Sequence, residues 1–252
     1  MAITAAMVKE LREMTGAGMM DCKKALAETD GDMDAAVEVL RKSGAAKAEK
    51  KASRIAAEGI TRTAANDNTA VVVEVNSETD FVAKNAVFQE FVQSIADQAL
   101  ASSLNGGKDG EDVEALLAEN GLKEALVEKT ATIGEKLSFR RFEKVTGDVV
   151  TSYLHGGGRI GVLVEADTDV VNDEIKSCLR NVAMQVAAMY PKYVSRDEVD
   201  ASFLEHEKEI LLAQAKQENP NKPDNIIEKM IIGRLNKEMK EICLLDQVYV
   251  QD

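Results

Sequence analysis

Histidine and cysteine most readily supply acid–base, nucleophilic or metal-binding chemistry near neutral pH, and this chain contains few of them. It has two histidines, His155 and His206, and three cysteines, Cys22, Cys178 and Cys243. The cysteines lie far apart without paired metal-ligand spacing, so we expect buried, reduced thiols rather than disulfides or a zinc site. We expect His206 in solvent, whereas His155 is either a turn residue or a partner contact. An enzyme is therefore the minority hypothesis, with paired carboxylates as its remaining route to acid–base chemistry.

A glycine pattern, Gly156-x-Gly158-x-x-Gly161, formally matches a dinucleotide-binding fingerprint. In that fingerprint the glycines lead from a strand into a helix, whose N-terminus holds the pyrophosphate. Here the next residues are IGVLV (160–164), which predict a second strand, so the pattern indicates a hairpin turn. The sequence contains no GxxxxGK[ST], HExxH or GxSxG motif. We therefore expect neither a cofactor nor a metal.

The most informative side chain is Phe81, which follows Thr79 and Asp80, a pair typical of a helix start with either residue as the N-cap. In one interpretation Phe81 packs where that helix begins. In the other, a bulky aromatic beside a cap carboxylate contacts another protein. Met19 and Met20 allow a similar argument, because adjacent helical residues point about 100° apart. A small helical unit is then expected to bury one and expose the other as adaptable contact area.

The overall composition limits what these residues can be part of. The 252 residues include 31 basic and 44 acidic side chains, a net charge of −13, with 45% hydrophobic and 4% aromatic residues. This acidity argues against direct nucleic-acid binding unless the basic residues cluster, and the apolar content argues against wholesale disorder. No stretch approaches the roughly 18 apolar residues of a membrane span, and no signal peptide is evident. We expect a cytoplasmic protein, not bound to membranes, with a mainly helical, aliphatic interior.

Charge divides the chain near residue 54. Residues 1–54 hold ten basic and nine acidic residues, a net charge of +1, whereas residues 55–252 hold 21 and 35, a net charge of −14. The first block predicts three short amphipathic helices, with a glycine-bearing turn at 15–18 and Asp32 as the N-cap of the third. Its end, residues 41–54, has six basic residues and one acidic residue. This basic stretch is a solvated helix or linker, and serves either as a flexible tether or as a patch for an acidic partner.

An internal repeat predicts the architecture after residue 55. A shift of 89 residues lays NSETDFV (76–82) over EADTDVV (165–171), with Val170 opposite Phe81. In each copy, β-branched runs are followed by a helical pattern. Predicted strands are 69–75, 137–145, 148–154 and 160–164, and the connecting helices are 112–120 and 123–136. The repeat indicates two related α+β subdomains rather than one doubly wound sheet.

The last region predicts a pair of helices. Residues 196–218 are charged and helical, with Val199, Phe203, Ile210 and Ala213 spaced along them, and the prolines within 219–223 must end that helix. Apolar residues from Ile227 to Ile242 then mark a return helix. High charge on both helices favours a protruding antiparallel coiled coil. The predicted class is α+β, with domains at 1–54 (three helices and basic linker), 55–145 and 146–194 (core subdomains) and 195–245 (arm).

In four segments the chain resembles the bacterial translation elongation factor Ts family. The segments are MVKELREMTGAGMMDCKKAL (7–26), VNSETDFVAKNAVFQEFV (75–92), IGEKLSFRR (133–141) and YLHGGGRIGVLVEA (153–166). The resemblance implies a ubiquitin-associated-like three-helix domain, two duplicated α+β subdomains and a coiled-coil insertion. It also implies a guanine nucleotide exchange factor for elongation factor Tu, which is not an enzyme.

The resemblance assigns residues to that role. A motif of four residues is expected to disturb the Mg²⁺ site of GDP-bound elongation factor Tu, so that GDP leaves and GTP can bind. These residues are Thr79, Asp80, Phe81 and Val82. Met19 and Met20 are expected to contact the same G domain, and His155, in the HGGGRIG turn, another part of the partner.

The resemblance implies that the partner is elongation factor Tu in its GDP-bound and nucleotide-free forms, and we expect no direct nucleic acid and no membrane. Family chains continue past the arm, so the end at Asp252 implies a truncated or incomplete chain. The alternative functions are a non-enzymatic adapter that binds small partners through residues 1–54, and an enzyme with a pocket of carboxylates whose pKa values are shifted.

Overall fold

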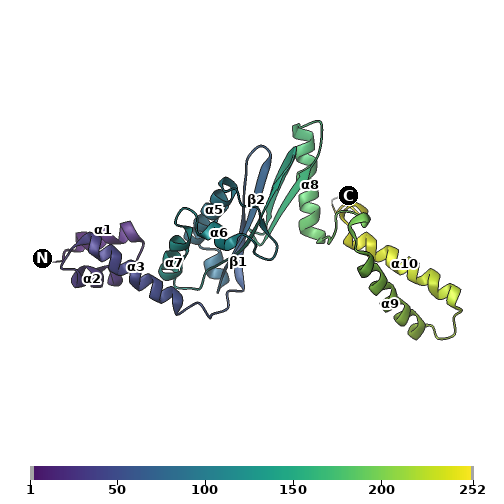
Figure 1. Ribbon diagram of the computed structural model, residues 1–252, viewed down its shortest axis with the longest axis horizontal. Coiled ribbons are helices and arrows are strands. Elements are labelled where there is room, and N and C mark those ends of the chain that lie inside the picture. Colours follow the sequence, from purple (N-terminus) through teal and green to yellow (C-terminus); the bar gives the residue numbers. More distant parts are fainter. Residues whose placement is uncertain (1–2, 251–252) are drawn as a thin grey trace. The chain divides into compact units, whose positions relative to one another are not determined.

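The computed structural model describes residues 3–250 and has two compact units, residues 1–180 and 181–252. Helices and two antiparallel sheets make up the first unit, and helices make up the second (Figure 1). The predicted α+β class is confirmed. The finer division at residues 54, 145 and 194 stays a prediction.

Three helices open the first unit, as the sequence predicts. They are α1 (Ala5–Thr15), α2 (Met19–Glu28) and α3 (Met33–Glu49). Asp32 caps α3 by accepting the backbone N–H of Ala35 at 2.9 Å, and Gly16 ends α1 with a left-handed φ of 66°. The helices enclose a small apolar cluster of Val8, Leu11, Cys22, Ala25, Leu26 and Ala36. Because α3 continues to Glu49, most of the basic stretch is helical.

The larger sheet has four antiparallel strands in the order β1-β2-β4-β3. They are β1 (Glu58–Ala65), β2 (Thr69–Ser77), β4 (Ser138–Thr146) and β3 (Gly106–Gly107). The β-branched run at 69–75 forms a central strand with Val71, Val73 and Val75 buried on one face and Val72 half-buried on the other, a setting that favours Val. β3 was not predicted, because two glycines carry no side-chain pattern.

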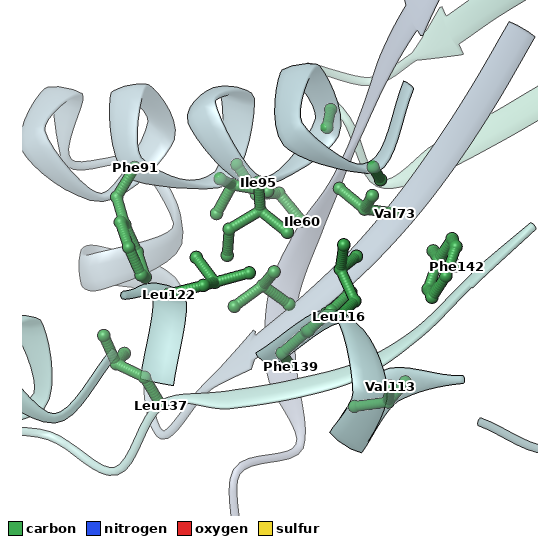
Figure 2. Packing of buried hydrophobic residues seen from close by; sticks show 14 of the residues in the cluster. Ile60, Val73, Phe91, Ile95, Val113, Leu116, Leu122, Leu137, Phe139 and Phe142 are labelled. Atoms are coloured by element: carbon green, nitrogen blue, oxygen red, sulfur yellow. The ribbon is translucent and has the colours of Figure 1, made fainter. Parts of the chain in front are cut away.

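Helices cover one face of this sheet. They are α4 (Asp80–Ala83), α5 (Ala86–Ala101), α6 (Val113–Leu117) and α7 (Leu122–Ile133). Figure 2 shows Ile95 of α5 beside Ile60 of β1 and Phe91 of α5 beside Leu122 of α7, within the buried cluster that also contains Val73 and Phe139 of the sheet. This cluster makes the sheet and its helices a rigid base for the turns at their ends.

A second hairpin completes the repeat. It consists of β5 (Val149–His155) and β6 (Ile160–Ala166), and α8 (Asp173–Met189) follows it. The glycine pattern therefore lies at a hairpin turn between β5 and β6, as predicted. A Cβ added at Gly161 would lie 2.7 Å from Thr61 Oγ1 and 2.8 Å from Val72 Cγ2. The hairpin thus approaches β1 and β2 closely at this point, and only glycine fits there.

Two antiparallel helices dominate the second unit. They are α9 (Ala201–Glu218) and α10 (Asp224–Ile242), preceded and followed by short 3₁₀ turns at Arg196–Glu198 and Leu244–Asp246. The predicted break at 219–223 is confirmed. Ala215 packs with Ile227 and Ile231 at one end, and Val199 with Met239 and Cys243 at the other.

The contact seam of α9 differs in part from the predicted one. Ile210 and Ala213 are exposed, whereas Leu211 and Leu212 pack against the partner helix. Several apolar residues adjoin one another on α9, so spacing alone did not select the buried ones.

Cysteine burial was predicted correctly at two of three positions. Cys22 and Cys243 are buried, but Cys178 is exposed. On α8, Cys178 lies at the edge of the strip formed by Ile175, Leu179 and Val182, where helical spacing does not decide burial. No helix between residues 3 and 250 is long and apolar enough to cross a membrane. The same residues contain no group of three or more His, Cys, Asp and Glu side chains placed to hold a metal ion.

Candidate functional site

The predicted motif, Thr79 to Val82, consists of the N-cap of α4 and the first three residues of that helix, just after the end of β2. Thr79 is the N-cap of α4, with an extended backbone (φ −126°, ψ 156°), and its hydroxyl accepts the Val82 N–H at 3.4 Å. The predicted helix start is confirmed, but the helix is interrupted. The Asn85 side chain accepts the N–H groups of Val87 and Phe88, and so caps a second helix, α5. The motif therefore lies on a single helical turn.

Phe81 projects from this turn into solvent. Its exposed fraction is 82%, so the interpretation that it packs where the helix begins is wrong. The following residue, Val82, packs against the main core. Val82 therefore anchors the turn to the core, whereas the side chain of Phe81 projects away from it.

Asp80 is an ionised, paired carboxylate beside Phe81. Its Oδ2 accepts a hydrogen bond from Lys84 Nζ at 2.6 Å. That hydrogen bond, with the charge of Lys84, lowers the pKa of Asp80 below its ordinary value. The charge of Arg159, in the β5–β6 turn, lowers this pKa further. The site therefore combines a carboxylate that is paired with Lys84 and an exposed aromatic ring.

Glu135 holds the backbone that precedes the motif. Its Oε2 accepts the N–H of Glu78 at 3.1 Å and the N–H of Thr79 at 3.0 Å. Its Oε1 accepts the Thr79 hydroxyl at 2.6 Å. Sequence reasoning missed Glu135, because 56 residues separate it from Thr79. The available signal was its place in IGEKLSFRR, a segment that carries the family resemblance.

Glu78 ties the same turn to the end of the basic stretch. Its Oε1 accepts the N–H of Lys136 at 2.6 Å, and both its carboxylate oxygens lie 3.4 Å from Arg54 Nη1. The bond from Lys136, followed by the charge of Arg54, lowers the pKa of Glu78; partial burial opposes the shift. Lys136 Nζ also donates to the Arg54 carbonyl at 2.9 Å. The last residue of the basic stretch is therefore bound to the core.

Comparison with known proteins decides the family. Residues 78–252 match the family model for "Elongation factor TS". Elongation factor Ts of Clostridioides difficile (strain 630) is 55% identical over 258 aligned residues, which cover 99% of this chain and 82% of that protein. The chain belongs to the elongation factor Ts family. Its matched region begins at Glu78 and so includes the whole Thr79–Val82 motif.

In this elongation factor Ts chain both methionines of α2 are exposed. The exposed fractions are 57% for Met19 and 74% for Met20, so the expectation that one would be buried is wrong. Cys22, Ala25 and Leu26 fill the inward face of α2 instead. The two methionines form an adaptable apolar surface at the start of the helix.

The third predicted contact of this elongation factor Ts chain, His155, ends β5 in an exposed position. Its Nδ1 lies 3.0 Å from the hydroxyl of Tyr153. The turn that follows is docked on β1, because the Gly158 carbonyl accepts the Thr61 N–H at 2.7 Å and the Thr61 hydroxyl at 2.9 Å. Arg62 Nη1 donates to the Gly157 carbonyl at 3.1 Å. His206 is exposed on α9, as predicted.

Proposed function

We propose that this protein is a guanine nucleotide exchange factor for elongation factor Tu. It binds the GDP-bound partner, accelerates GDP release and leaves a nucleotide-free complex that GTP can enter. The observation that carries this proposal is that Phe81 is 82% exposed on a short helical turn. In the same turn Thr79 caps the helix, Asp80 pairs with Lys84, and Val82 packs against the core. An exposed aromatic on a rigid base suits insertion into another protein, because little conformational entropy is lost on binding.

The four residues of the motif have separate roles in this mechanism. Phe81 enters the G domain of elongation factor Tu near its Mg²⁺, and Asp80 brings a negative charge to the same place. Thr79 caps the turn and Val82 anchors it. Since Mg²⁺ requires near-ideal octahedral coordination, moving the elements that position its ligands weakens both metal and phosphate binding.

Reciprocal coupling then accounts for exchange. If the factor lowers the affinity of the partner for GDP, GDP lowers the affinity of the partner for the factor by the same ratio. A short-lived ternary complex therefore loses GDP faster than the binary complex does. Exchange by this route requires no bond to be made or broken by this chain.

Other exposed residues extend the proposed interface. Met19 and Met20 contact the same G domain through their thioethers, and His155 contacts a different part of the partner. The net charge of −13 favours work through a protein rather than through nucleic acid or a membrane. We accordingly assign the protein to the cytoplasm, together with the translation machinery.

The direct test measures release of labelled GDP from purified elongation factor Tu, with and without this protein. We expect faster release with the wild-type protein, and little acceleration with the double substitution Asp80→Ala, Phe81→Ala. No acceleration by wild-type protein contradicts the exchange function. Acceleration that survives the double substitution contradicts only the role assigned to the motif.

A further inference from the structure

We propose that Glu135 is a positioning residue that fixes the direction in which Phe81 leaves the protein. The role deepens, and rests on, the exchange function proposed above. Phe81 is 82% exposed, so packing of its own ring cannot hold it. Its direction depends on the backbone from Glu78 to Asp80, and Glu135 binds that backbone.

Three hydrogen bonds converge on the Glu135 carboxylate from this short segment. Two come from the consecutive N–H groups of Glu78 and Thr79, at 3.1 and 3.0 Å. The third comes from the Thr79 hydroxyl at 2.6 Å. Hydrogen bonds to an ionised acceptor are shorter and stronger than neutral ones. A single side chain therefore restrains two peptide units and one side chain directly before Asp80.

The hydroxyl bond also orients the helix cap. A threonine hydroxyl has one hydrogen and two lone pairs. Since the Thr79 hydrogen is donated to Glu135, a lone pair is left to accept the Val82 N–H, 3.4 Å away. Glu135 thereby supports the cap of α4, which has only four residues and little stability of its own.

Glu135 is itself held on rigid structure. It lies between Gly134, the left-handed C-cap of α7, and the start of β4 at Ser138. Ser138 pairs with Asn76 of β2, the strand that leads into the motif. The N–H of Lys136 donates to Glu78 Oε1 at 2.6 Å, which closes a reciprocal pair of bonds between the two turns. Glu135 therefore connects the backbone that precedes Phe81 to the rigid core of the sheet.

A spectroscopic experiment on the free protein tests positioning without any partner. The chain contains no tryptophan, so Phe81→Trp introduces a single indole at the position of interest. We expect Glu135→Ala in this background to increase fast indole motion, measured as a lower residual amplitude in nanosecond fluorescence anisotropy decay. Glu135→Gln is expected to keep most of the order, because its amide oxygen still accepts the backbone N–H groups.

Glu114→Ala on α6 is the matched control, since it removes an exposed glutamate of the same unit. It should leave the anisotropy decay unchanged. Unchanged indole motion in Glu135→Ala, with a native circular dichroism spectrum, overturns the proposal. If Glu135→Ala does not fold, the Phe81→Trp protein with Glu135 intact decides: indole motion as fast as in an unfolded chain overturns the proposal.

GDP release from elongation factor Tu supplies the second readout. Glu135→Ala should lower the release rate at saturating factor by roughly tenfold, the scale expected for lost bonds to a charged group. The factor concentration for half-maximal effect should change by less than about threefold, because the remaining contacts are intact. In a Phe81→Ala background, Glu135→Ala should have no further effect.

Equal losses from Glu135→Ala with and without Phe81 contradict positioning, since they show that Glu135 acts independently of the ring. A Glu135→Ala protein as active as wild type contradicts it as well. If wild-type protein does not accelerate GDP release, the proposed exchange function fails. The anisotropy experiment then still decides whether Glu135 orders residue 81.

Discussion

Glu78 and Glu135 each accept a hydrogen bond from the turn that contains the other. Glu135 Oε2 accepts the N–H of Glu78 at 3.1 Å, and Glu78 Oε1 accepts the N–H of Lys136, the neighbour of Glu135, at 2.6 Å. Two acidic side chains are tolerated in these adjoining turns because backbone N–H groups donate to both carboxylates and Arg54 pairs with Glu78. The pair joins the end of β2 to the start of β4, where the exposed motif begins.

Acid should weaken this junction through Glu78. Its pKa is lowered from the ordinary value of 4.5, first by the Lys136 N–H. Stabilisation by the ionised form is thus fully present above the unfolded-state pKa and is lost as pH falls through the lower, folded-state pKa. We expect Glu78→Gln to lower the thermal unfolding midpoint near neutral pH, with a difference from wild type that narrows at acidic pH.

The measurement is circular dichroism melting of both proteins over a pH series that spans the carboxylate range. Glu114→Gln on α6 serves as the control for the loss of an exposed carboxylate in the same unit. A Glu78→Gln difference that does not depend on pH would contradict the role given to the ionised carboxylate.

Phe81→Ala should separate function from stability. Because the ring is 82% exposed, its removal should change the free energy of unfolding by less than about 0.5 kcal/mol, while stimulated GDP release falls sharply. Val170→Ala is the matched control from the second copy of the repeat, where the exposed fraction is 54%. It should leave both quantities unchanged. Urea unfolding and labelled-GDP release measure the two effects, and equal losses of release in both variants would refute a specific role for Phe81.

Buried Phe88→Ala provides the contrast within the same region. The Phe88 side chain is 0% exposed, so its truncation leaves a cavity and should cost about 3–5 kcal/mol. Urea unfolding should therefore rank Phe88→Ala far below Phe81→Ala in stability. Similar losses in the two proteins would mean that Phe81 packs in solution.

Local sequence rules predicted the elements better than the site. The Val-rich run of β2, the Asp32 cap and the Pro-containing break at 219–223 each depend on neighbours in the chain. Each of them appears in the structure. The motif itself followed from the Thr79 cap and, for its role, from the family resemblance.

Contacts between residues that lie far apart in the sequence could not be predicted. The bond from Thr79 to Glu135 spans 56 residues, and no spacing rule pairs a glutamate after a helix with a distant threonine. The exposure of Phe81 was equally undecided, because a cap followed by an aromatic is compatible with a packed or a free ring. The helix is interrupted at Asn85, so Phe81 lies on a separate helical turn. This interruption depends on the Asn85 side chain, which caps α5, and that cap was not predicted.

Two glycines should respond to alanine in opposite directions. Gly161→Ala places a Cβ 2.7 Å from Thr61 Oγ1 and 2.8 Å from Val72 Cγ2, and such overpacking should destabilise the first unit by about 1–3 kcal/mol. Gly233, in the interior of α10, has open space around its added Cβ. Gly233→Ala should stabilise that helix by roughly 0.5–1 kcal/mol. Urea unfolding decides both, and a stabilising Gly161→Ala would contradict the close approach of the second hairpin to β1.

The methionines of α2 should affect binding rather than folding. Met19 and Met20 are 57% and 74% exposed, so changing both to Ala should leave the unfolding midpoint nearly unchanged. If they contact the G domain, the factor concentration for half-maximal GDP release should rise by about tenfold, equivalent to roughly 1.4 kcal/mol of lost apolar contact. The rise should persist at high salt, because screening affects charges and not apolar surface. Met14→Ala is the matched control: Met14 is 58% exposed on α1, and an equal effect there would show that any exposed methionine of this domain suffices.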